Sequence, residues 1–151
     1  MANQIDREVF LENVFALLEE TFENTRGIYL DRGTSLFDTL APLSSEQVSR
    51  DVNGNTIAAH VEHARFYLVV LREFMNGRTE KVDWAESWKL KTVTDEQWND
   101  LKDALRREYA ETVIFFKSTE DWNDERIGGA LAIIAHTAFH NGAIRQILKA
   151  V

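Results

Sequence analysis

The scarcity of proline most constrains what this chain can fold into. Only one proline, Pro42, and seven glycines occur in 151 residues, and proline is the residue that interrupts helices most strongly. No stretch sustains the alternation of apolar and polar residues that is typical of strands. The sequence therefore favours long, uninterrupted helices over a turn-rich β fold.

Four stretches carry apolar side chains at three- and four-residue steps, which predicts four amphipathic helices. We expect these helices over residues 3–25, 56–76, 95–118 and from about Glu125 almost to Val151. In the first helix the acidic residues are expected on the side opposite the apolar stripe; they are Glu12, Glu19, Glu20 and Glu23. Four such helices predict an all-α fold, a four-helix bundle formed by a single domain over residues 1–151.

The connector over residues 28–53 is too long to be bare loop in a compact domain. Its segments 35–40 and 45–48 predict short helical turns on either side of Pro42. A second connector contains Trp84 and Trp88 within a polar segment. Because indole rings are costly to leave in water, we expect this segment to fold back over the bundle, either as a lid over a pocket or as a plug at one end of the core.

Composition and charge exclude several classes of function. The net charge of −8, without a Lys/Arg-rich run, disfavours nucleic-acid binding. The chain has no cysteine, so it offers no disulfide, thiolate ligand or cysteine nucleophile, which fits the cytoplasm. No apolar run reaches the roughly 18 residues of a membrane span, and the N-terminus lacks the pattern of a secretory signal. We expect a cytoplasmic protein with no nucleic-acid or membrane partner.

All four histidines fall in two pairs on predicted helices, His60 with His63 and His136 with His140. At about 100° per residue, the second pair lies about 40° apart on one face. That face is expected to carry Gly129, Ala132, Ile133, Ala143, Ile144 and Ile147, while Thr137, Asn141 and Arg145 point elsewhere. On the other helix, His60 lies close to the centre of the apolar stripe, His63 lies towards an edge, and Glu62 points outward.

Buried imidazoles need a partner, since burial without one costs about 1–3 kcal/mol. A hydrogen-bond acceptor or a metal ion can satisfy them, and imidazole suits zinc, nickel, iron and copper. A pair at i,i+4 supplies two ligands, and a third histidine from a facing helix completes a site with open positions. In such a site a bound water or substrate group loses its proton near neutral pH. The chain lacks the glutamate patterns of zincins and of di-iron bundles.

Three segments make the chain similar to the DinB-like superfamily of small four-helix metalloproteins: Leu43-Ser-Ser-Glu46, Thr56-Ile-Ala-Ala-His-Val-Glu-His63 and His136-Thr-Ala-Phe-His-Asn-Gly-Ala-Ile144. The resemblance covers nearly the whole chain, and the last segment is its most specific part. It implies a divalent metal ion held by His63, His136 and His140. The stripe geometry slightly prefers His60, which then is an alternative ligand or a pocket residue beside the site. Ala143 stands where relatives often have glutamine.

The reaction is less specified, because characterised members of this superfamily include thiol S-transferases and thiol-dependent isomerases. The resemblance implies a metal-dependent enzyme that activates a small thiol or water towards a small molecule, with zinc or nickel as the expected ion and iron or manganese as alternatives. Arg72 is expected to help bind an anionic thiol if it faces the pocket. The second hypothesis is a non-catalytic metal- or ligand-binding or stress-response protein, which a pocket filled by Trp84 or Trp88 would favour. The superfamily also implies a homodimer, for which Phe10 and Leu17 are candidate contacts.

Overall fold

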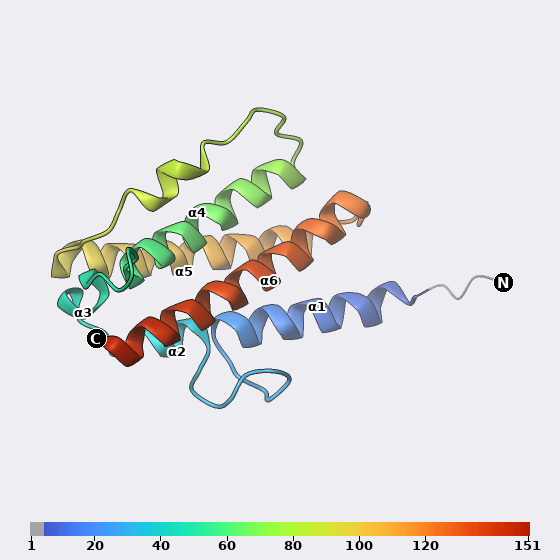
Figure 1. Ribbon diagram of the computed structural model, residues 1–151. Coiled ribbons are helices and arrows are strands. Elements are labelled where there is room, and N and C mark those ends of the chain that lie inside the picture. The colour runs from blue at the N-terminus through green and yellow to red at the C-terminus, as the bar shows by residue number, and fades with distance from the viewer. Residues whose placement is uncertain (1–4) are drawn as a thin grey trace.

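The computed structural model describes residues 5–151, and these form helices without a strand (Figure 1). The α-helices are α1 (Arg7–Phe22), α2 (Leu36–Leu40), α3 (Ser45–Ser49), α4 (Ile57–Met75), α5 (Asp95–Ser118) and α6 (Asp124–Ile147). Two 3₁₀ turns, η1 (Trp84–Trp88) and η2 (Leu148–Ala150), complete the described elements. The predicted all-α class is confirmed, and α2 and α3 occupy the predicted turns of the first connector. The predicted start of the first helix at residue 3 lies outside the described residues.

Local capping explains why the helices begin where they do. The side chain of Thr56 accepts a hydrogen bond from the backbone N–H of Ala59 at the start of α4. At the start of α5, Thr94 and Gln97 form a reciprocal capping box. These side chains satisfy backbone N–H groups that have no partner within the helix. The predicted boundaries of both helices are therefore within one residue of those observed.

The long helices pack around α4, which lies against α5 and α6, while α1 lies against α6 (Figure 1). Large side chains from every α-helix are fully buried between them; they include Leu18, Leu36, Val48, Leu68, Leu105 and Ile133. Burying each such side chain contributes about 1.5–3 kcal/mol. The contact between α4 and α6 matters most for function, because these two helices carry all four histidines.

Helix α6 has no charged residue between Arg126 and Arg145. Its most apolar 18-residue window has a mean hydropathy of 1.2, so the segment Asp124–Ala150 is long and apolar enough to span a membrane by length and composition alone. The expectation concerned an uninterrupted apolar run of about 18 residues, and α6 has none, because His136, Thr137, His140 and Asn141 interrupt it. The core helix of a soluble protein passes the test of length and composition as well, and 39% of that window is buried within the described structure.

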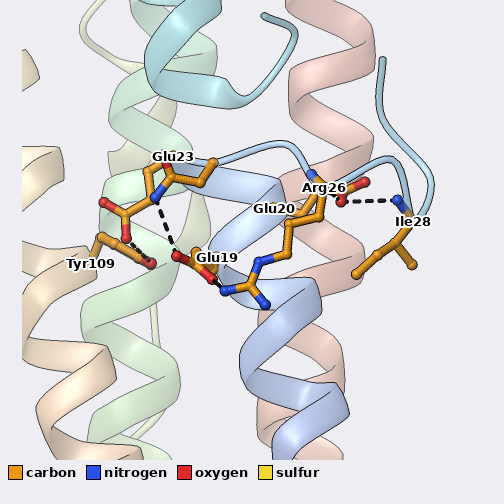
Figure 2. Close-up of polar contacts among 7 residues, drawn as sticks. Glu19, Glu20, Glu23, Arg26, Ile28 and Tyr109 are labelled. Carbon is orange, nitrogen blue, oxygen red and sulfur yellow. Dashed lines mark hydrogen bonds and ion pairs between the residues drawn. The ribbon is translucent and has the colours of Figure 1, made fainter. Parts of the chain in front are cut away.

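Glu20 determines how the chain leaves α1. Its carboxylate is fully buried and accepts four backbone N–H bonds, from Arg26 and Ile28 at one oxygen and from Tyr29 and Leu30 at the other, at 2.7–3.0 Å. Figure 2 shows Arg26 and Ile28 converging on this carboxylate. The prediction that Glu20 shares the charged outer side of the helix is wrong. The loop wraps around Glu20, so α1 ends at Phe22 rather than at residue 25.

Candidate metal centre

The closely packed helices α4 and α6 bring the two histidine pairs face to face. His60 and His63 come from α4, and His136 and His140 come from α6. Three of these side chains are buried, and His136 is half-buried. The fold therefore places four imidazoles inside the contact between two helices.

Three of the histidines aim the same ring nitrogen at one point. The Nε2 atom of His136 lies 3.0 Å from Nε2 of His63 and 3.2 Å from Nε2 of His140. One ligand atom from each of the three rings lies within 4.8 Å of the other two. These are the three residues that the family resemblance implies as metal ligands. The structure shows that they lie close together and could hold a metal ion.

His60 lies on the far side of the His140 ring. Its Nδ1 atom is 2.8 Å from Nδ1 of His140, so it contacts the ring nitrogen that does not face the other two histidines. His60 also lines a surface hollow of about 360 Å³ beside Ala143 and Ile147. His60 therefore contacts His140 on the side away from the other two histidines. This position matches the alternative role, that of a pocket residue beside the metal site.

Electrostatics keep the rings in the form that binds metals. Burial lowers the pKa of His60 and His63, and repulsion between the rings adds to the effect at His63. The same causes lower the pKa of His136 to about 4 and that of His140 to about 3. All four imidazoles are therefore neutral at pH 7. A neutral ring has a free lone pair, which a metal ion requires.

The spacing of the nitrogens fits a tetrahedral ion. Zinc–nitrogen bonds of about 2.0–2.1 Å in a tetrahedron place two ligand nitrogens about 3.3 Å apart. The two Nε2 separations from His136, 3.0 Å to His63 and 3.2 Å to His140, are close to that value. The donor set, three neutral nitrogens, also leaves the full double charge of a divalent ion uncancelled. The residues present therefore fit the ion that the sequence predicts.

Aromatic rings surround the three converging histidines. Trp88 stacks on His63 with ring centroids 4.2 Å apart, and Tyr67 stacks on His136 at 3.5 Å. Phe139 meets the edge of His140 at 5.2 Å. Trp84 lies 6.4 Å from His63 and is 37% exposed. The predicted fold-back of the tryptophan segment is confirmed, and it covers histidines of α4.

Two residues of the site were not predicted from the sequence. Ser87, in η1, is almost fully buried, and its Oγ atom lies 2.7 Å from Nδ1 of His63. A serine in a connector carries no signal of such a contact. For Tyr67 the sequence does contain such a signal, because Tyr67 follows His63 by four residues and therefore lies on the same face of the helix.

Several side chains near the predicted site lie among neighbouring helices in ways that a single apolar stripe does not describe. Thr137 and Asn141 are buried, because α6 is covered by both α1 and α4 and so buries a wider arc than one stripe. Arg72 faces α5, where it pairs with Glu108 and donates a hydrogen bond to Thr112, and it is not available to bind an anionic thiol beside the histidines. Glu62 is half-buried and forms an ion pair with Arg65 of the same helix.

Comparisons of the chain with models of protein families, with curated proteins and with solved structures found no match. The assignment of a function therefore depends on the geometry of the histidine centre and on the residues around it.

Proposed function

We propose that this chain is a metal-dependent enzyme of the DinB-like type, in which the four long helices form a bundle around a site made by His63, His136 and His140. The convergence of three Nε2 atoms from two helices carries the proposal. Zinc or nickel is the expected ion, since neutral imidazoles suit both, and iron or manganese is the alternative.

Some residues of the site would hold the ion, and others would line the space around it. Three imidazoles fill three positions and leave the others open to small molecules. A divalent ion held there would supply Lewis acidity, which lowers the pKa of a thiol or water that reaches it. The chain has no cysteine, so a sulfur nucleophile has to arrive as a cosubstrate. Trp84 and Phe139, both exposed beside the histidines, offer apolar contacts to a small electrophile.

One observation favours the second candidate, a non-catalytic metal- or ligand-binding or stress-response protein. The Trp88 ring stacks directly on His63 and also lies near His60 and His140. An indole in this place takes up space that a substrate would need. The two candidates share the metal site and differ in whether a small molecule reaches it.

Metal analysis and turnover separate the two candidates. Protein purified without a histidine tag is expected to contain about one divalent ion per chain. The loaded protein is then tested with low-molecular-weight thiols against halogenated and epoxide electrophiles, and with water alone against hydrolysable esters and amides. Turnover above the uncatalysed rate, lost in His136→Ala, supports the enzyme. Rates equal to those of the thiol or water alone, with the ion in place, contradict it and favour the binding protein.

The homodimer stays a prediction. Phe10 and Leu17 pack partly buried against the core of their own chain, which reduces what they offer to a second copy. Ile5 and Val9, near the start of α1, are exposed and offer an apolar surface instead. Sedimentation at micromolar concentration distinguishes a dimer from a species of 17.4 kDa, the mass of one chain.

A further inference from the structure

We propose that Ser87 is a positioning residue of the metal centre, through which the η1 turn fixes the ring of His63 in the tautomer that binds metal. This inference rests on the proposed metal site and names a residue that acts on it without being a ligand.

The direction of the hydrogen bonds follows from the atoms at hand. The Oγ atom of Ser87 lies 2.6 Å from the carbonyl oxygen of Trp84 and 2.7 Å from Nδ1 of His63. A carbonyl oxygen only accepts, so the single hydroxyl proton of Ser87 is donated to Trp84. The Oγ atom is then an acceptor towards His63, and Nδ1 of His63 must carry the ring proton.

The position of that proton decides whether His63 can be a ligand. A neutral imidazole carries one ring proton, so a proton on Nδ1 leaves the lone pair on Nε2. This Nε2 atom is the one that faces Nε2 of His136. In the other tautomer an N–H group would occupy the point where the three nitrogens converge. Ser87 therefore selects the tautomer in which His63 presents a lone pair there.

The same turn also holds the plane of the ring. Trp88, the next residue, stacks on His63 with an angle of 21° between the ring planes. Ser87 is 1% exposed, so water does not readily replace its hydroxyl. The orientation of His63 thus depends on η1 remaining against α4. By thermodynamic linkage, an ion bound by His63 must in turn stabilise η1 in this position.

The test uses zinc, a coloured chelator that competes for it, and the full chain. Removing the hydrogen-bond partner of a ligating histidine typically weakens metal binding about 10- to 100-fold. Ser87→Ala is therefore expected to weaken zinc binding by about that factor. Nitrogen NMR of the metal-free protein is expected to show His63 protonated at Nδ1 in the wild type and as a mixture of tautomers in Ser87→Ala. Ser87→Thr keeps the hydroxyl and is expected to keep the wild-type tautomer.

The matched control is Ser35→Ala. Ser35 is also fully buried, and its hydroxyl also bonds to a backbone carbonyl, that of Glu23, without touching a histidine. The zinc affinity of the Ser35→Ala variant is expected to equal that of the wild type. Wild-type affinity in Ser87→Ala would overturn the inference while leaving the metal site intact. A wild-type protein that binds no zinc would instead refute the proposed function. An Nε2 proton on His63 in the metal-free wild type would overturn the inference without any variant.

Discussion

Two sites at which the molecule buries polar groups, one around Glu20 and one between α4 and α6, satisfy these groups differently. Glu20 accepts four backbone hydrogen bonds, so both of its oxygens are satisfied by the chain itself. In the histidine centre, Nδ1 of His136 is buried without a hydrogen-bond partner among the described residues. The three Nε2 atoms face one another rather than a donor or acceptor of another kind. The backbone thus satisfies the carboxylate of Glu20 completely, whereas the converging imidazole nitrogens have only one another as neighbours within hydrogen-bond distance.

Both places also lower pKa values, with opposite effects on charge. Burial alone would raise the pKa of Glu20, but four N–H groups outweigh it and hold the pKa at about 2. Glu20 therefore stays charged throughout the physiological range. Burial lowers the pKa of the histidines and keeps them neutral. The first site stabilises a charge of the protein, and the second gathers neutral nitrogens that could hold a metal ion.

The largest expected effect is the loss of metal binding when a ligand is removed. His63→Ala, His136→Ala and His140→Ala each leave two imidazoles, which make a poor site, so zinc affinity is expected to fall on the order of 1,000-fold or more. Chelator competition and metal analysis of each purified variant measure this. Full zinc content in His136→Ala would show that the histidine centre is not the ligand site and would remove the contrast with Glu20.

The next effect lies at the other site and concerns stability. Glu20→Gln removes the charge that four N–H groups solvate and places an amide N–H₂ against two of these donors. The free energy of unfolding, measured in urea, is expected to fall by about 3 kcal/mol. Zinc binding should be unchanged, because Glu20 lies outside the histidine centre. Glu12→Gln, at an exposed position on the same helix, is the control and should change stability by less than about 0.5 kcal/mol.

Acid should destabilise the metal-free protein in two overlapping pH ranges. The folded-state pKa of the histidines is lowered from 6.5, to about 4 at His136 and about 3 at His140, so below pH 6.5 the unfolded chain binds more protons. Stability is therefore full above about pH 6.5 and falls as pH falls towards 3. Glu20, lowered from 4.5 to about 2, adds a second loss between those values. Urea unfolding with chelator present, from pH 8 to 2, measures both ranges.

Variants at each site show which of the two sites causes the loss of stability in each pH range. His140→Ala should make the decline below pH 6.5 shallower, and Glu20→Gln should make the further decline below pH 4.5 shallower. Stability that stays constant between pH 7 and 5 would contradict the neutral, buried state of the imidazoles.

The same contrast explains what could be predicted from the sequence. The histidine centre was predictable, because the spacing of His136 and His140 is local to one helix and the resemblance supplied His63. The role of Glu20 was not, because its partners come from a loop six to ten residues later, which helical periodicity does not describe. Ser87 was missed for the same reason, since its contact with His63 exists only after η1 folds back onto α4.

The smallest expected effect concerns His60, which belongs to the histidine centre but contacts only the back of His140. If Nε2 of His140 is to bind an ion, the ring proton of His140 must be on Nδ1. That N–H group would then donate a hydrogen bond to Nδ1 of His60, which is 2.8 Å away. His60→Ala leaves that N–H group without its acceptor in a buried place, so zinc affinity is expected to fall about tenfold. His60→Gln, whose side-chain oxygen also accepts, is expected to recover most of this loss.

Chelator competition on these two variants and on His63→Ala also tests which histidine of α4 is the ligand. If His60→Ala loses zinc while His63→Ala retains it, the ligand assignment on α4 is wrong. Ser87 would then orient a histidine that does not bind the ion. If His60→Ala binds zinc as tightly as the wild type, the His60–His140 contact does not matter for the ion. Partial loss in His60→Ala and complete loss in His63→Ala is the expected order, because one removes a supporting acceptor and the other removes a ligand.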